Sequence, residues 1–226
     1  TGKVIVSALI DRVRKFESEG LVRRYPHHEF IRLLVSDNDG LQVCNGARIK
    51  DIYTGEIYDC FGTVVLAAGG INGLFPDMTT GTVANSGDVT ATVFAQGVYL
   101  SNLEMIQYHP TTIGISGKRL LVTEAARGEG GRLCIKRNDR LWYFMEEIYP
   151  ELKNLMPRDI VSRQMYKVVR NNDCDDQVYL DMTGVDGEIW KTKLPDMRKE
   201  LIHYLGLDPK TDLIPVEPGI DRKSVV

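Results

Sequence analysis

The chain has 226 residues, of which 43% are hydrophobic and 26% charged, and its formal net charge is -3. This composition is typical of a globular protein. The negative balance gives no electrostatic reason to expect a nucleic acid or an anionic membrane as a partner. No stretch approaches the roughly 18 unbroken apolar residues of a membrane span. We therefore expect a cytoplasmic protein.

The cysteines and histidines show no metal-binding pattern. The adjacent His27 and His28 point in opposite directions if they lie on a strand, and no cysteine stands near them in the sequence. We expect no metal site. The cysteines show no CxxC spacing, so reduced thiols are the simplest interpretation. They are Cys44, Cys60, Cys134 and Cys174.

The N-terminal segment predicts a helix. Apolar residues recur there at the spacing of one helical face, and Gly20 is well placed to end the helix. The recurring residues are Val6, Leu9, Ile10, Val13 and Phe16.

Three β-rich runs follow, at residues 29–36, 41–53 and 56–67. The sequences DNDG and TGE separate them and are typical of hairpin turns. We therefore predict a β-meander after the helix. The run TVVLAA at residues 63–68 is apolar enough to be buried on both faces, which predicts a central strand.

The composition changes near residue 103, where we place a domain boundary. Before it, the chain is rich in Gly, Thr, Asn and Ser and contains one predicted helix, DVTATVFAQGV, which ends near Gly97. After it, aromatic, Pro and charged residues increase, and helices are predicted near residues 158–170 and 190–205. The fold class is a mixture of α/β and α+β.

Residues 67–70 read AAGG, directly after the predicted central strand. Glycine has no Cβ, so the backbone here can approach a flat or phosphorylated ligand closely. A simple turn is the alternative, and the chain contains no GxGxxG, the usual start of a pyrophosphate-binding helix. The pattern alone leaves both interpretations open.

The motif QYHPTTIG contains a candidate binding histidine. Pro110 biases His109 toward an extended conformation, so its ring leaves the backbone at a kink rather than from a helix face. The two threonines that follow offer hydroxyl donors. A hydrogen-bonded structural histidine is the alternative.

The motif TEAARGEGG places Glu124 and Arg127 on the same side of a helical turn. On an exposed surface such a pair contributes only about 0–1 kcal/mol. Behind a buried cleft it could pass protons.

The motif MPRDIVSR places an arginine at the start of a helix. Pro157 suits the first turn, so Arg158 sits at the positive end of the helix dipole, where a cation is disfavoured. Asp159 partly offsets this. An unfavourable arrangement indicates function, whereas a solvated arginine is the plain alternative.

In chain order, AAGG, HPT, TEAARGEGG, PRDIVSR, YLDMT and IPVEPG resemble the motifs of one family. It comprises the flavoprotein subunit of succinate dehydrogenase and fumarate reductase, and its relative L-aspartate oxidase. The resemblance covers nearly all of residues 1–219. It implies that residues 1–103 are the later part of the first FAD-binding, Rossmann-like segment, and that residues 104–219 form an α+β capping domain. The family's active site lies between these domains.

The resemblance also implies roles for single residues. His109 would bind a substrate carboxylate with the help of Thr123. Glu124 and Arg127 would deliver protons to Arg158, the general acid. The implied contacts to FAD are Ala68, Gly69, Gly70, Gly87 and Asp88.

The implied function is an FAD-dependent oxidoreductase of C4 dicarboxylates that works by hydride transfer between flavin and substrate. Succinate or fumarate and L-aspartate are nearly equal as substrates. A succinate dehydrogenase or fumarate reductase would also have an iron–sulfur subunit as partner, which would make the protein membrane-peripheral. The alternative from another class is a non-catalytic flavin-fold interaction module, which requires the candidate catalytic residues to be scattered in space.

Two features depart from the family. Val89 follows Asp88 where the family usually has glycine, so the local flavin contact would differ. Residues 220–226 resemble a non-native tail. We expect a fragment that binds FAD poorly and is inactive alone.

Overall fold

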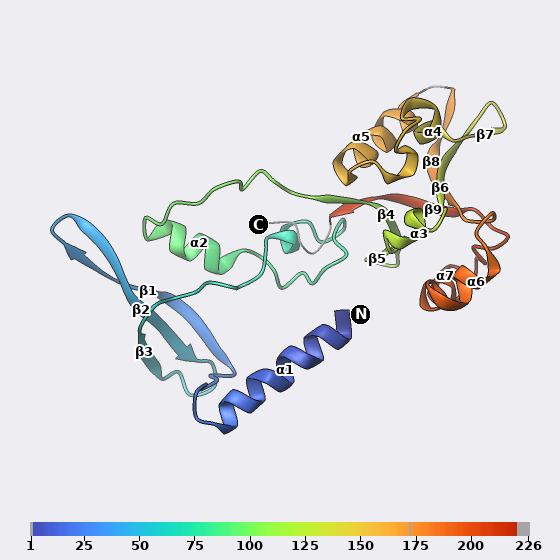
Figure 1. Cartoon of the computed structure of the whole chain (residues 1–226). Helices are drawn as coiled ribbons and strands as arrows, with labels where there is room; N and C mark the ends of the chain where they lie inside the picture. Colours follow the sequence, from blue (N-terminus) through green and yellow to red (C-terminus); the bar gives the residue numbers. More distant parts are fainter. Residues whose placement is uncertain (1, 172, 221–226) are drawn as a thin grey trace. The chain divides into compact units, whose positions relative to one another are not determined.

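The computed structural model describes residues 2–171 and 173–220 (Figure 1). The chain divides into two compact units. Unit 1 comprises Thr1–Ala67 and Val89–Val98, and unit 2 comprises Ala68–Asp88 and Tyr99–Val226. The boundary predicted at residue 103 stays a prediction.

The predicted N-terminal helix is confirmed as α1 (Gly2–Ser18) in unit 1. Just beyond its end, Gly20 has a φ of 74°, and the amide of Leu21 donates back to the carbonyl of Phe16. A glycine in this left-handed conformation is a common way to end a helix. The apolar side chains of α1 are largely exposed, with Leu9 at 61%.

The predicted β-meander is also confirmed. Strands β1 (His28–Asn38), β2 (Leu41–Asp51) and β3 (Ile57–Phe61) pair antiparallel in that order. At the first turn, Asp39 and Gly40 both have positive φ, 53° and 82°. Such turns match the right-handed twist of the strands that they join.

The prediction of a central strand at residues 63–68 is wrong. After β3 the chain runs without regular structure, and Val65 is 84% exposed. A buried strand needs neighbours that satisfy its N–H and C=O groups. Among residues 2–171 and 173–220, no strand pairs with this apolar run.

The predicted helix before Gly97 is confirmed as α2 (Asp88–Ala95). Within unit 1, the side chain of Gln96 pairs with the backbone of Leu33 on β1, accepting from its amide at 2.9 Å and donating to its carbonyl at 3.1 Å. Val93 is buried, at 2% exposure. These contacts hold the end of α2 against the meander.

Residues 71–87 of unit 2 form a loop, the Asn72 loop, around the buried side chain of Asn72. The amide nitrogen of Asn72 donates to Thr79 Oγ1 and to the carbonyl of Thr82, both at 3.0 Å. Its oxygen accepts from Asn85 Nδ2 at 3.1 Å. A short 3-10 helix, η1 (Asn72–Leu74), begins the loop. Side-chain hydrogen bonds thus replace a regular backbone ladder here.

The rest of unit 2 is built on an antiparallel sheet whose strands were not predicted individually. Their order is β5-β4-β9-β8-β6-β7. The strands are β4 (Tyr108–Ile115), β5 (Lys118–Leu121), β6 (Arg132–Arg137), β7 (Arg140–Trp142), β8 (Cys174–Asp181) and β9 (Ile214–Ile220).

The core of unit 2 lies on this sheet. Helix α5 (Arg158–Val169) packs against β4, β8 and β9, and it confirms the helix predicted near residues 158–170 (Figure 1). Two rows of directly paired apolar residues cross β6, β8 and β9, which is how side chains stabilise a sheet. The rows are Leu133–Leu180–Ile214 and Ile135–Val178–Val216.

The helix predicted near residues 190–205 is broken into α6 (Gly187–Thr192) and α7 (Pro195–Leu205). The break falls at Pro195, which lacks an N–H and is tolerated only in the first turn of a helix. The other short helices are α3 (Ala125–Gly128), α4 (Phe144–Ile148) and the 3-10 helix η2 (Lys153–Leu155).

Ile220, where the predicted non-native tail begins, is fully buried as the last residue of β9 and pairs with Tyr108. Residues 221–226 lie outside the described residues. No helix in the described part of the chain is long and apolar enough to cross a membrane. The combination of helices and antiparallel sheets confirms the mixed fold class.

The thiols should differ in reactivity. Cys134 is fully buried, and burial raises its pKa to about 12, whereas Cys44 is exposed. A thiolate is the reactive species. Alkylation of the folded protein near pH 8, followed by peptide mass spectrometry, should therefore modify Cys44 and spare Cys134 until denaturant is added. Equal labelling of both in the folded protein would contradict the packing of β6.

Candidate active site

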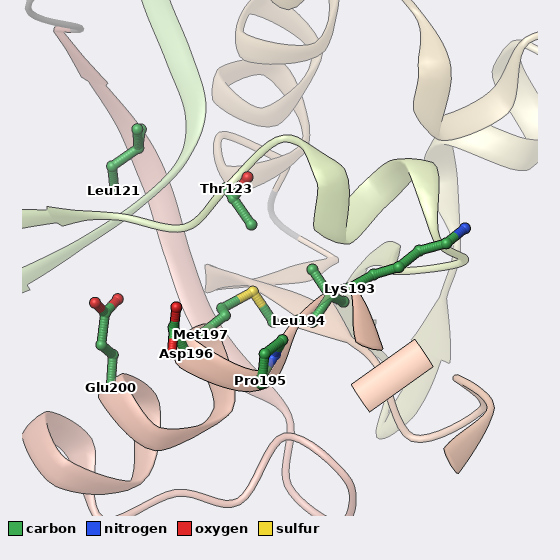
Figure 2. A pocket seen from close by; sticks show the side chains of 8 residues that line it. All are labelled: Leu121, Thr123, Lys193, Leu194, Pro195, Asp196, Met197 and Glu200. Atoms are coloured by element: carbon green, nitrogen blue, oxygen red, sulfur yellow. The ribbon is translucent and has the colours of Figure 1, made fainter. Parts of the chain in front are cut away.

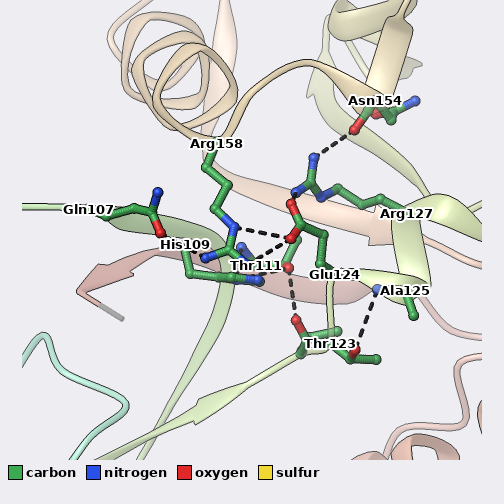
Figure 3. A network of polar contacts seen from close by, with 10 residues as sticks. Gln107, His109, Thr111, Thr123, Glu124, Ala125, Arg127, Asn154 and Arg158 are labelled. Atoms are coloured by element: carbon green, nitrogen blue, oxygen red, sulfur yellow. Dashed lines mark hydrogen bonds and ion pairs between the residues drawn. The ribbon is translucent and has the colours of Figure 1, made fainter. Parts of the chain in front are cut away.

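Arg158 is the first residue of α5, directly after its N-cap Pro157, as the sequence predicts. Its Nε and Nη2 donate to Glu124 Oε2 at 3.1 and 2.7 Å. Its Nη1 donates to Gln107 Oε1 at 3.0 Å. The side chain is 23% exposed. The guanidinium at this helix start is therefore held by acceptors from two other segments of unit 2 (Figure 3).

Arg127 lies on the short helix α3, and its side chain is 1% exposed. Its Nη2 donates to Glu124 Oε1 at 2.9 Å, and its Nη1 donates to the carbonyl of Asn154 at 2.6 Å. Its buried Nε has no hydrogen-bond partner among the described residues. Burial, together with the positive charge of Arg158, lowers the pKa of Arg127, against the opposing attraction of Glu124.

Glu124 connects the two arginines, with one carboxylate oxygen toward each (Figure 3). The hydrogen bond from Arg158 lowers the pKa of Glu124, and the charges of Arg158, Arg127 and His109 lower it further. The spacing of Glu124 and Arg127 predicted a pair on one side of a helical turn, and this is confirmed as an ion pair.

His109 lies on β4 and is 1% exposed. Its Nδ1 accepts from the backbone amide of Thr111 at 3.3 Å and lies 3.4 Å from the Thr111 hydroxyl. That hydroxyl donates to the carbonyl of Val122 at 3.0 Å. The pairing of β4 with β9 is irregular between His109 and Thr112. Because His109 is part of strand β4, the extended conformation expected before Pro110 is confirmed. Its imidazole is buried inside unit 2.

Thr123 is less closely joined to this group. Its hydroxyl accepts from the amide of Ala125 at 3.4 Å. Its side chain also lines a cavity of about 200 Å³ beside Met197 and Glu200 of α7 (Figure 2). The structure therefore brings His109, Glu124, Arg127 and Arg158 together, with Thr123 beside them along the chain.

The five predicted FAD contacts lie at the two ends of the Asn72 loop. Ala68 and Gly69 are exposed, and Gly70 and Gly87 are half-buried. Asp88 begins α2 and accepts from the hydroxyl of Ser86 at 2.7 Å.

The backbone geometry at the two ends of the loop requires glycine at positions 69 and 87. Gly69 has a φ of 83°, and a Cβ there would lie 2.7 Å from Asn85 Oδ1. Gly87 has a φ of 79°, and a Cβ there would lie 2.7 Å from the side chain of Ile71. The backbone at Ala68 and Gly69 is nevertheless exposed and carries no large side chain, so a flat, phosphorylated cofactor such as FAD could approach it closely.

Two residues of the site were not predicted from the sequence. Gln107 could have been found, because it stands two residues before His109 on an extended chain and therefore faces the same side. Asn154 carries no such signal, whereas Thr111 is one of the two threonines expected to donate through a hydroxyl, and it does so. Asn154 is 6% exposed, and its Oδ1 accepts from the amide of Leu133 at 2.9 Å, which fixes the carbonyl that holds Arg127.

Residues 1–223 match the family described as the FAD binding domain. The chain belongs to this family. FAD is accordingly its cofactor, and the predicted resemblance to flavoprotein oxidoreductases is confirmed.

Two relatives of the family illustrate the match. The chain is 33% identical over 224 residues to the succinate dehydrogenase flavoprotein subunit of Bacillus subtilis (strain 168), covering 97% of the chain and 38% of the relative. It is 34% identical over 221 residues to L-aspartate oxidase 2 of Ralstonia nicotianae, covering 97% of the chain and 39% of the relative. The chain thus spans less than half the length of either relative.

The chain is also similar to solved structures of flavoprotein enzymes. A quinol-fumarate reductase with menaquinol molecules superposes with a TM-score of 0.71 at 26% identity, covering 89% of this chain and 36% of that chain. Mycobacterium smegmatis Sdh1 superposes with a TM-score of 0.59 at 30% identity, covering 96% and 36%.

The charge of Glu124 should make stability depend on pH. Because its pKa is lowered in the folded protein, its ion pairs stabilise the fold above its ordinary pKa of 4.5, and this stability is lost as the pH falls through the lower folded value. The Tm difference between wild type and Glu124→Gln should therefore be largest near pH 6 and shrink toward pH 3.

Glu188→Gln is the matched control, because it removes an exposed carboxylate that pairs with Lys191 on α6. Surface pairs of this kind contribute little. A Glu124→Gln protein whose Tm deficit is the same at pH 3 and pH 6 would contradict the bridging role of the carboxylate.

Proposed function

We propose that the protein oxidises or reduces a C4 dicarboxylate, of the succinate/fumarate or L-aspartate type, as part of an FAD-dependent oxidoreductase. The observation that carries the proposal is the carboxylate of Glu124 between two arginines, beside a buried histidine. A surface ion pair would not need a guanidinium that is 1% exposed.

Substrate binding is assigned to His109 and Arg158. A C4 dicarboxylate carries a negative charge at each end, so its recognition requires cations or hydrogen-bond donors on both sides. The Arg158 guanidinium stands at the start of α5, where the helix dipole also favours an anion. Thr123 is assigned a supporting contact through its hydroxyl, which would have to turn from the Ala125 amide.

FAD, when bound, supplies or takes up the hydride. The contacts that would hold it are Ala68, Gly69, Gly70, Gly87 and Asp88. Of these, Ala68, Gly69 and Asp88 are exposed, so their backbone or side chain is open to a ligand.

Proton transfer to the substrate is assigned to Arg158, Glu124 and Arg127. Arg158 would give a proton to the substrate carbon and be reprotonated through Glu124 by Arg127. Each transfer follows a hydrogen bond, from Arg127 Nη2 to Glu124 Oε1 at 2.9 Å and between Glu124 Oε2 and Arg158 Nη2 at 2.7 Å. The lowered pKa of Arg127 favours release of its proton.

The partner depends on the substrate. One similar structure is a quinol-fumarate reductase, whereas the relative in Ralstonia is an L-aspartate oxidase. If this protein acts on succinate or fumarate, we expect an iron–sulfur subunit beside it. The alternative of a non-catalytic module requires scattered residues, and the grouping of His109, Glu124, Arg127 and Arg158 argues against it.

Substituting Arg158 should separate catalysis from cofactor binding. In the enzyme expressed from the complete gene, Arg158→Gln removes the proposed proton donor, so kcat should fall about 10²–10⁴-fold, the usual contribution of a general acid. The flavin absorbance should stay at the wild-type level. Arg163→Gln is the matched control, because Arg163 lies on the same helix but is 72% exposed. An Arg158→Gln enzyme within threefold of wild type would exclude the proposed role.

The substrate class requires a direct comparison. The same purified enzyme should be assayed for succinate oxidation, fumarate reduction and oxidation of L-aspartate to iminoaspartate. We expect the succinate/fumarate couple and L-aspartate oxidation to differ by at least about tenfold, since a missing or unpaired polar contact costs about 1–3 kcal/mol. Absence of all three activities in a flavin-loaded enzyme would refute the proposal.

A further inference from the structure

Arg119 on β5 forms a second polar cluster, separate from the arginines of the site. Its side chain is only 11% exposed. Its Nη1 donates to Glu217 Oε1 of β9 at 2.6 Å and to Thr112 Oγ1 of β4 at 3.1 Å. Thr112 Oγ1 in turn donates to the carbonyl of Glu217 at 2.7 Å. The guanidinium thus joins three neighbouring strands.

The other side of the same guanidinium reaches the Asn72 loop. Arg119 Nε and Nη2 donate to the carbonyl of Asp77 at 3.3 and 3.2 Å. Next to this point, the amide of Ile220 donates to the carbonyl of Met78 at 2.7 Å, and the amide of Thr80 donates to the carbonyl of Ile220 at 3.0 Å. Arg119 and the end of β9 therefore both attach the Asn72 loop to the sheet.

The packing around Arg119 leaves no spare room. A Cβ at Gly219 would lie 2.5 Å from Arg119 Cδ, 2.6 Å from Thr112 Oγ1 and 3.0 Å from the Met78 carbonyl. Gly219 is the direct partner of His109 in the pairing of β4 with β9. Arg119 is therefore closely packed against Gly219, the residue of β9 that pairs with His109.

We propose that Arg119 is a positioning residue that fixes the Asn72 loop relative to His109. The inference rests on the proposed function, in which Gly69 and Gly87 at the ends of this loop contact FAD and His109 binds the substrate. A shift of the loop would change the distance between cofactor and substrate, and misplacement of about 1 Å can cost 10²-fold in rate.

The chemistry of the contact requires arginine rather than lysine. The guanidinium presents several donors in a rigid plane, and here they serve acceptors on β4, β9 and the loop at once. A lysine ammonium is a compact point charge and cannot span the same acceptors. Arg119→Lys therefore keeps the charge but should lose the link to the carbonyl of Asp77.

Amide hydrogen exchange of this chain tests whether Arg119 holds the Asn72 loop, and it requires neither bound flavin nor an activity assay. In Arg119→Lys and Arg119→Ala, amides of residues 71–85 should exchange at least about fivefold faster than in wild type, whereas those of β8 should be unchanged. Arg163→Ala is the control for loss of an exposed arginine. Unchanged exchange of the loop in both Arg119 variants would overturn the proposal.

The functional part is tested in the flavin-loaded enzyme from the complete gene. The dissociation constant for FAD should rise about tenfold in Arg119→Ala, which corresponds to about 1.4 kcal/mol, the loss expected for a small set of hydrogen bonds. The kcat should fall while KM for the dicarboxylate changes less than about twofold, because His109 and Arg158 are untouched. Arg119→Lys should lie between Ala and wild type.

The outcomes separate this inference from the proposed function. If the wild-type enzyme binds no FAD, the proposed function fails, whereas the exchange experiment still decides whether Arg119 holds the loop. If Arg119→Ala does not fold, Arg119→Lys alone decides, because it keeps the charge but should lose the link to the carbonyl of Asp77. Wild-type FAD affinity, kcat and loop exchange in the Arg119 variants that fold would overturn the positioning role.

Discussion

The grouping of the two arginines in the candidate site depends on the carboxylate of Glu124. Glu124 holds Arg127 on one side and Arg158 on the other, so that two guanidiniums can lie close together although one of them is almost fully buried. Without the intervening negative charge, the buried arginine would face both desolvation and repulsion from its neighbour, which are the two effects that already lower its pKa. The same geometry that stabilises the pair also provides two short hydrogen bonds in series, which is what a proton relay requires.

The six-stranded sheet makes this grouping possible. Its strands bring together segments that are far apart in the sequence: β4 supplies His109, the turn after β5 supplies Glu124, and α5 packs across the sheet with Arg158 at its first residue. His109 and Arg158 are therefore each anchored by an element with buried apolar residues, and side chains held in this way keep their geometry better than side chains on free loops. Asn154 extends the same principle, because its side chain is bound to β6 while its carbonyl holds Arg127.

Local patterns were enough to predict some parts of the structure and not others. Helix α1, the meander, α2 and the start of α5 follow from spacing, glycine and proline signals within a few residues. The run at residues 63–68 was predicted wrongly because burial of a strand depends on distant partners, which its own apolar composition cannot reveal. The same limit applies to the site: the spacing of Glu124 and Arg127 is local, whereas the carbonyl of Asn154 reaches Arg127 only through tertiary folding.

The most direct test is a crystal structure of the complete, FAD-loaded enzyme with a bound, unreactive C4 dicarboxylate. It should show the Arg158 guanidinium within hydrogen-bond distance of both the ligand and Glu124, with the imidazole of His109 on a ligand carboxylate and Arg127 still on the far side of Glu124. A ligand bound elsewhere, or an Arg158 side chain that points into solvent while the ligand is in place, would contradict the central claim that these four residues form one substrate site.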